Sequence, residues 1–216
     1  MATEPYSCEH VVPIDEEPQH HLIVANEYVR AFAVEIAPQE RTLCHHHPND
    51  YFLYVASGAE IISAARDEEP KNLNYEDGEC EWSSAGLTHV VENLGDTWFR
   101  NVVVELLPAA SKLRRGEAPQ PARGHSHVEE VLEETAGSVF HVSLTPGAEV
   151  QISGPAVLAS AYDDKLTLKE LDEFDIPLDE FRKPMWVCAP RQVEIRNSGQ
   201  KPARVIVFQV GSDTAE

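Results

Sequence analysis

The stretch of sequence best suited to chemistry is His45-His46-His47, which Tyr51 follows four residues later. Side chains alternate between faces along a strand, so in an extended segment His45 and His47 point to one side and His46 to the other. Two imidazoles on one face, two residues apart, can share a metal ion. His89 can supply a third imidazole from a neighbouring strand, and the sequence therefore predicts a facial three-histidine metal site.

Three neutral imidazoles leave a divalent ion with its full charge and, in octahedral geometry, about three open positions. Such a site would stabilise an anionic bidentate ligand, for example a carboxylate, an enolate or a thiolate. Fe(II) is the favoured ion because it suits a site that binds substrate and dioxygen together, although Zn, Ni, Mn and Cu also accept imidazole. Tyr51, if it faces inward, would hydrogen-bond a ligand oxygen or donate a proton, and a direct bond from Tyr51 to the metal is an alternative.

Short β-type runs, broken by Gly, Pro, Asn and Asp, must position these residues. The clearest runs are Val29–Ile36, Tyr51–Ala56, Ala59–Ala64, Trp98–Leu107, Ser138–Leu144 and Ala203–Val210. Lys165–Phe181 has helical character up to the break that Pro177 imposes, and Val128–Glu134 suits a helix or a strand. Many strands with few helices predict an all-β sandwich or barrel.

The two halves of the chain repeat each other. An asparagine, a glycine and an arginine precede an apolar strand with the same spacing in each half: Asn93, Gly95 and Arg100 in the first, and Asn197, Gly199 and Arg204 in the second. Arg30–Pro38 likewise parallels Ser138–Pro146, and this ordered series of matches indicates a duplication. Because Ser111–Gly124 is rich in Arg, Pro and Gly, we expect domains at 1–112 and 125–216 joined by a linker at 113–124.

The histidine motif and its surroundings resemble the cupin superfamily, whose motifs read G-x5-H-x-H-x3-E-x6-G and G-x5-P-x-G-x2-H-x3-N. The matching positions are His45, His47 and Gly58 in the first motif and Gly78, Gly86, His89 and Asn93 in the second. The sequence departs from the motifs at Gln39 (for Gly), Tyr51 (for Glu) and Ser84 (for Pro). The resemblance implies two tandem cupin barrels, that is, double-stranded β-helices or jelly rolls.

The resemblance also bears on activity, because the superfamily includes iron-dependent three-histidine members, the thiol dioxygenases and a diketone-cleaving dioxygenase. It implies a metal-dependent, dioxygenase-like oxidoreductase acting on a small anionic or chelating substrate. His45, His47 and His89 would hold the metal and Tyr51 would assist catalysis. A metal-dependent isomerase or lyase, and a non-enzymatic cupin that binds or senses a small ligand, remain alternatives.

The second half carries a degenerate copy of the site. Counting along the repeat puts Ser153 and Pro155 at the positions of His45 and His47, and Val193 at that of His89, and none of the three binds metals. His125 and His127 imitate the first motif with one residue missing. The repeat aligns them instead with the region around Gln19–His21, before the first strand of the second half.

Thirty-seven acidic residues against seventeen basic ones produce a formal charge of −20, which repels nucleic acid and anionic lipid. The acidic N-terminus resembles no signal peptide, and no apolar run approaches the roughly 18–20 residues of a membrane span. Four scattered cysteines predict reduced thiols in a cytoplasmic protein, with Cys44 as a buried apolar filler. We expect a small-molecule ligand, no nucleic-acid or membrane partner, and a homodimer paired through edge strands.

Overall fold

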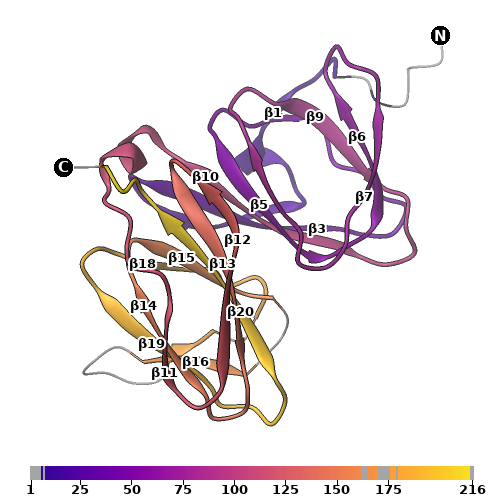
Figure 1. The fold of residues 1–216 in the computed structure, drawn as a ribbon. Helices are drawn as coiled ribbons and strands as arrows, with labels where there is room; N and C mark the ends of the chain where they lie inside the picture. The colour runs from indigo at the N-terminus through magenta and orange to yellow at the C-terminus, as the bar shows by residue number, and fades with distance from the viewer. Residues whose placement is uncertain (1–5, 7, 162–164, 170–175, 179, 215–216) are drawn as a thin grey trace. The chain divides into compact units, whose positions relative to one another are not determined.

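The computed structural model describes residues 6, 8–161, 165–169, 176–178 and 180–214. These residues form four five-stranded sheets, two from each half of the chain (Figure 1). The two sheets of each half make one jelly-roll barrel, so the all-β, two-barrel fold class is confirmed. None of the described residues belongs to a helix long and apolar enough to cross a membrane.

The first barrel consists of two sheets with a cavity between them. One sheet has the order β1-β4-β9-β6-β7, with β1 at Val12–Pro13, β4 at His45–His46, β9 at Thr88–Asn93, β6 at Glu60–Ala65 and β7 at Lys71–Asn74. The other has the order β2-β3-β10-β5-β8, with β2 at His20–Ala25, β3 at Val29–Ile36, β10 at Phe99–Leu106, β5 at Tyr51–Ser57 and β8 at Cys80–Ser83. A short 3₁₀ helix, η1 at Ile14–Glu16, lies between β1 and β2.

The second barrel repeats this topology strand for strand. Its sheets are β11-β14-β19-β16-β17 (Gln120–Arg123, Glu149–Ser153, Gln192–Asn197, Leu166–Lys169, Ile176–Pro177) and β12-β13-β20-β15-β18 (Ser126–Glu134, Gly137–Leu144, Ala203–Val210, Ala156–Ser160, Met185–Val187). Because β11 to β20 follow the order of β1 to β10, the structure confirms the duplication that the sequence predicts.

The repeated asparagine explains part of the sequence repeat. Asn93 is fully buried, and its Nδ2 donates to the carbonyl oxygens of Ile36 at 3.0 Å and Thr97 at 2.7 Å, while its Oδ1 accepts from the N–H of Gly95 at 2.9 Å. Asn197 makes the three corresponding bonds in the second barrel. Both side chains close the turn that follows a strand, which is a structural role and not a chemical one.

The contacts divide the chain into two compact units. One contains the residues up to Leu22 together with Phe32–Glu105, and the other contains Ile23–Ala31 together with the residues from Leu106 onward. The segment at 113–124, expected to be a linker, contains β11, which pairs with β14 in a sheet of the second barrel. The 3₁₀ helix η2 at Pro108–Lys112 precedes it.

One local expectation was wrong. The helix expected over Lys165–Phe181 is replaced by β16 and β17, which pair with each other, while 170–175 and 179 lie outside the described residues. The apolar side chains of β16 fill the core of the second barrel, and this burial outweighs helix propensity. The ambiguous Val128–Glu134 lies within strand β12.

The four cysteines are not all reduced, as we had expected. Cys8 and Cys44 form a disulfide, whereas Cys80 and Cys188 are free. The sequence separation of 36 residues concealed the pair, because only the fold brings the N-terminal segment beside β4. Cys44 is buried, as predicted, but it is one half of a cross-link and not an apolar filler.

Candidate metal centre

Strands β4 and β9 bring the three predicted histidines together. His45 and His89 are directly opposite each other in the antiparallel pair, and His47 follows where β4 ends. All three are buried, with ring centroids 4.6 Å apart for His45–His89, 5.1 Å for His45–His47 and 5.3 Å for His47–His89. His46 is only half-buried and hydrogen-bonds Thr88 Oγ1 through its Nδ1 at 2.8 Å.

A fourth histidine, which the sequence did not single out, joins this cluster. His20 begins β2, is 7% exposed, and lies with its ring centroid 4.5 Å from that of His45. The potential ligand nitrogens of His20, His45 and His47 all lie within 4.8 Å of one another. The available sequence signal was Glu17, three residues before His20, since a carboxylate that orients an imidazole often marks a metal ligand.

Each of the four imidazoles turns its Nδ1 towards an oxygen atom. Three of these contacts have hydrogen-bond length: His20 with Glu17 Oε2 at 2.6 Å, His45 with the carbonyl oxygen of Leu43 at 2.9 Å, and His89 with Ser63 Oγ at 3.1 Å. His47 Nδ1 lies 3.7 Å from Glu105 Oε1, beyond hydrogen-bond distance. With the ring proton on Nδ1, each Nε2 keeps its lone pair. The Nε2 atoms of His45 and His89 are buried and have no hydrogen-bond partner among the described residues. A metal ion would satisfy these lone pairs, so the residues fit such a group.

Glu17 links the N-terminal segment to the cluster. Its carboxylate is 2% exposed and also accepts hydrogen bonds from the backbone N–H of Gln19 at 2.8 Å and of Leu43 at 3.1 Å. Burial acts to raise the pKa of Glu17, but the hydrogen bonds from His20 and from the two backbone groups outweigh it and lower that pKa. The carboxylate is therefore charged at neutral pH and orients His20.

Burial keeps the imidazoles of His45, His47 and His89 neutral. Desolvation, followed by repulsion from the neighbouring histidines, lowers the pKa of His45 well below 6.5 and that of His89 to about 3. Desolvation also lowers the pKa of His47, against the opposing effect of Glu105. Neutral imidazole is the form that binds a metal, so the site is ready to bind at neutral pH.

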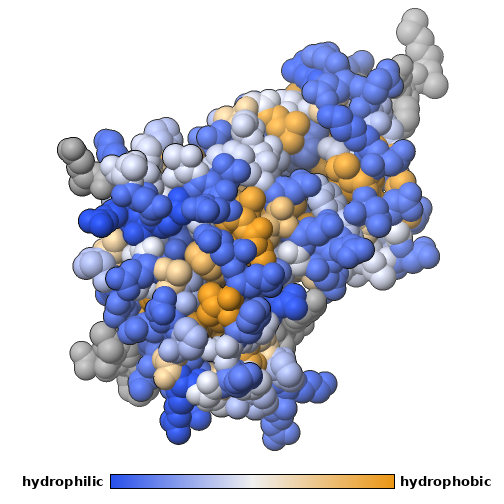
Figure 2. Space-filling model, viewed as in Figure 1, coloured by the Kyte–Doolittle hydropathy of each residue, from blue (hydrophilic) through white to orange (hydrophobic). Residues whose placement is uncertain are grey.

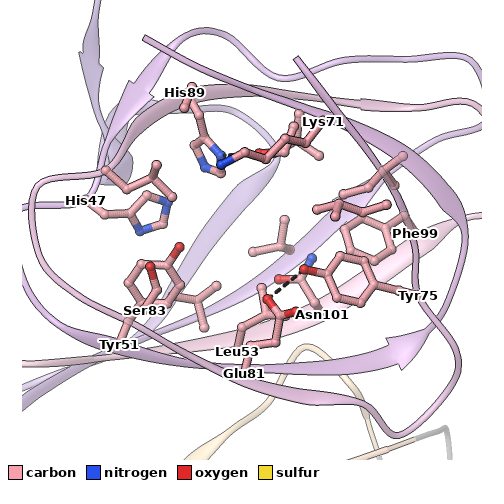
Figure 3. A pocket seen from close by; sticks show the side chains of 18 of the residues that line it. His47, Tyr51, Leu53, Lys71, Tyr75, Glu81, Ser83, His89, Phe99 and Asn101 are labelled. Atoms are coloured by element: carbon pink, nitrogen blue, oxygen red, sulfur yellow. Dashed lines mark hydrogen bonds between the residues drawn. The ribbon is translucent and has the colours of Figure 1, made fainter. Parts of the chain in front are cut away.

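A cavity of about 280 Å³ adjoins the histidines in the first barrel (Figure 3). Tyr51 forms part of its wall, is 5% exposed, and stacks on the ring of His47 with centroids 4.4 Å apart and planes 24° apart. Burial raises the pKa of Tyr51, against the opposing effect of a hydrogen bond with Ser83. The phenol therefore stays protonated and can donate a proton or a hydrogen bond into the cavity.

The second barrel has no corresponding cluster among its described residues. In the second barrel Ile152, and not Ser153, pairs with Val193, as His45 pairs with His89 in the first barrel. The positions equivalent to His45 and His47 therefore lie one residue earlier in the chain than counting along the sequence predicts. Ile152 and Val193 are buried in an apolar core. His125 and His127 are exposed at the start of β12, which has the place of β2 in the repeat.

Comparison with known proteins identifies the fold. No protein-family model and no curated protein matches the chain. Among solved structures, AerE from Microcystis aeruginosa is 15% identical over 90% of this chain and 98% of its own, with a TM-score of 0.62. Salicylate 1,2-dioxygenase from Pseudaminobacter salicylatoxidans is 10% identical over 88% and 76%, with a TM-score of 0.59.

A cupin 2 conserved barrel domain protein from Leptotrichia buccalis is 9% identical to this chain. The match covers 90% of this chain and 89% of the other, with a TM-score of 0.55. At such identities the likeness concerns the fold, and it extends over both barrels. Together with the duplicated topology and the two histidine motifs, it shows that this chain is a two-barrel protein of the cupin fold.

Proposed function

We propose that this chain is a metal-dependent, dioxygenase-like oxidoreductase that acts on a small anionic or chelating substrate. The observation that carries the proposal is a group of four buried histidines beside a cavity, of which His20, His45 and His47 have potential ligand nitrogens within 4.8 Å of one another. The structural likeness to salicylate 1,2-dioxygenase supports this class of reaction.

His45, His47 and His89 would hold one divalent ion, as the spacing predicts, and His20 would add a fourth nitrogen. Four imidazoles leave about two positions of an octahedron open, which suits a bidentate ligand or one substrate atom together with a small co-substrate. Fe(II), our favoured ion, would supply a centre at which an organic substrate and dioxygen could react; Zn, Ni, Mn and Cu also accept such a donor set.

The residues of the chain account for the choice of ligand. Because the imidazoles are neutral, they leave the positive charge of the ion uncompensated, and an anionic substrate group is favoured there. Glu17 hydrogen-bonds the outer nitrogen of His20 and orients its ring, and Glu105 lies 3.7 Å from the outer nitrogen of His47. Tyr51, protonated and stacked on His47, would hydrogen-bond the bound substrate or transfer a proton to it.

The protonated Tyr51 also favours a second candidate, a metal-dependent isomerase or lyase. A buried phenol at the cavity wall can protonate a carbanion or an enolate of the substrate without any change in oxidation state. Deuterium from solvent would then enter the product without consumption of oxygen.

The deciding experiment measures metal content and oxygen uptake of protein purified without an affinity tag and reconstituted anaerobically with Fe(II). We expect about one ion per chain, loss of the ion in His45→Ala and His47→Ala, and retention in His46→Ala, whose ring points away. Oxygen consumption with a panel of 2-hydroxy and 2-oxo carboxylates would support the oxidoreductase. Stoichiometric metal in the His45→Ala/His89→Ala double variant would contradict the site.

A further inference from the structure

We propose that Asn101 is a specificity-determining residue that hydrogen-bonds a hydroxyl group at the end of the substrate remote from the histidines. The inference rests on the proposed function and names its substrate class. That class is a small molecule with a chelating acidic group at one end, an apolar body, and a hydroxyl at the other end.

Strand β10 sets the distance between the two ends. Its residues pair with β5 in the order Glu105 with Tyr51, Val103 with Leu53, and Asn101 with Val55. Glu105 faces His47, so this end of the strand belongs to the histidine cluster. Asn101 lies four residues away, about 13 Å along a strand that rises about 3.3 Å per residue.

Asn101 carries a buried polar atom that the described residues leave unsatisfied. Its side chain lines the cavity and the residue is 3% exposed, yet its Oδ1 has no hydrogen-bond partner among the described residues. Figure 3 shows Asn101 on the same side of the cavity as Tyr75, away from His47 and His89. A register irregularity between Arg100 and Asn101 interrupts the pairing with β5 at this point, and such bulges commonly re-aim a side chain beside a binding site.

The other asparagines fully buried in the barrels behave differently. Asn93 and Asn197 use their amides to close turns, with three hydrogen bonds each. The repeat that matches Asn93 with Asn197 places Val205 at the position of Asn101, and Val205 is packed in the apolar core of the second barrel. The second barrel, whose described residues form no histidine cluster, therefore has an apolar residue at the position where the first barrel has the Asn101 amide.

Two further polar groups stand at this end of the cavity. The Tyr75 hydroxyl donates to Glu81 Oε2 at 2.7 Å, which leaves the phenol oxygen free to accept a hydrogen bond (Figure 3). The amide of Asn101 can both donate and accept, and a hydroxyl is the small group that matches both functions. A substrate hydroxyl placed here would satisfy the buried amide.

Apolar side chains form much of the cavity wall. They include Val34, Leu53, Ile61, Val91 and Val103. A cavity of about 280 Å³ is near the lower end of the roughly 300–1,000 Å³ typical of small-molecule sites, so it suits a body of the size of one ring.

The test compares 4-hydroxymandelate with 4-methylmandelate, which share a chelating α-hydroxy acid and a ring and differ by a hydroxyl for a methyl. Calorimetry on Zn(II)-reconstituted protein avoids turnover. We expect about tenfold tighter binding of the hydroxyl compound, the size of one net hydrogen bond. Asn101→Leu should abolish this preference and leave binding of the methyl compound unchanged.

Val103→Leu is the matched control, because it alters the shape of the cavity without altering its polarity; we expect it to weaken both ligands alike. Equal preference in wild type and Asn101→Leu, or no binding of either compound by the metal-loaded protein, would overturn the inference. Protein that takes up no metal would instead overturn the proposed function. In that case a preference of the metal-free protein for phenol over toluene, lost in Asn101→Leu, would still support the role of Asn101.

Discussion

The proposed chemistry depends on the direction in which four imidazole rings point. The Nδ1 atoms of His20, His45 and His89 lie within hydrogen-bond distance of protein oxygens, and for His20 that oxygen belongs to a buried carboxylate. Burying a carboxylate is destabilising unless its oxygens are hydrogen-bonded, and the Glu17 carboxylate accepts three hydrogen bonds. This arrangement makes Glu17 an orienting residue for the cluster.

Replacing Glu17 with Gln should lower the metal affinity by about 10- to 100-fold, the usual effect of removing an outer partner of a metal-bound histidine. Competition with a chromophoric chelator measures the change. Glu16→Gln removes a neighbouring exposed carboxylate and should leave the affinity unaltered. If both variants bind the metal as the wild type does, His20 is not a ligand.

Tyr51→Phe should lower kcat about 100-fold and leave the metal content unchanged, because it removes the proton donor but keeps the ring stacked on His47. Steady-state turnover and elemental analysis of the same sample provide the two readings. Tyr28→Phe, which changes a tyrosine outside the cavity lining, is the control. Loss of metal in Tyr51→Phe would indicate that the phenol binds the ion directly.

The metal-free protein should lose stability as the pH falls from 6.5 towards 3. The unfolded chain binds a proton on His89 near pH 6.5, whereas burial lowers the pKa of the folded residue to about 3. Between these values protons favour the unfolded state, at about 1.4 kcal/mol per pH unit for His89 alone. Urea denaturation across this range should show a shallower pH dependence for His89→Gln than for wild type, and parallel curves would contradict the assignment.

At the scale of elements, the N-terminal segment completes the site. The Cys8–Cys44 disulfide ties this segment to the residue before His45, and β1 pairs in parallel with β4. The N–H of Leu43 also donates a hydrogen bond to the Glu17 carboxylate. Three successive residues, Leu43, Cys44 and His45, therefore contact the N-terminal segment through a hydrogen bond, a disulfide and strand pairing respectively. The segment in turn presents His20 to the cluster.

The Cys8→Ser/Cys44→Ser double variant should be less stable by about 2–4 kcal/mol, since the cross-link closes a loop with a sequence separation of 36 residues. It should also bind metal more weakly, because His20 and Glu17 lose their anchor. Urea titration and chelator competition check the two effects. Cys188→Ser, which replaces an exposed free thiol, should change neither the stability nor the metal affinity. Unchanged stability of the double variant would mean that the disulfide does not form.

At the scale of the whole molecule, duplication has produced one barrel with a histidine cluster beside a cavity and one with an apolar core. Hydrophilic residues cover most of the face visible in Figure 2, in accord with the strongly acidic composition. The second barrel packs apolar side chains such as Ile152 and Val193 where the first has histidines.

The whole chain should therefore bind one metal ion and not two. Titration with Zn(II) in the presence of a weak competitor should reach an end point at about one equivalent. His45→Ala/His47→Ala should bind none at this site, whereas His125→Ala/His127→Ala, at exposed positions of the second barrel, should behave as the wild type. A second tight equivalent that survives loss of His45 and His47 would contradict the single-site assignment.

Sequence alone determined several of the strands, the duplication and three of the four clustered histidines. These features are local or periodic: apolar runs of strand length, a repeated Asn–Gly–Arg spacing, and alternation that puts His45 and His47 on one face. Val29–Ile36 and Ala203–Val210 coincide with β3 and β20, because both are apolar runs buried along almost their whole length. The resemblance to cupins rested on the same local spacing.

Only the tertiary structure decided the rest. His20, the Cys8–Cys44 disulfide and the unpartnered amide of Asn101 depend on contacts between residues far apart in the chain, which no local pattern encodes. Burial likewise turned Leu166–Lys169 into a strand despite its helical character, since packing against the barrel core outweighs an intrinsic propensity of less than about 1 kcal/mol per residue. Spacing along the chain selects which residues can meet, and long-range packing determines which of them do.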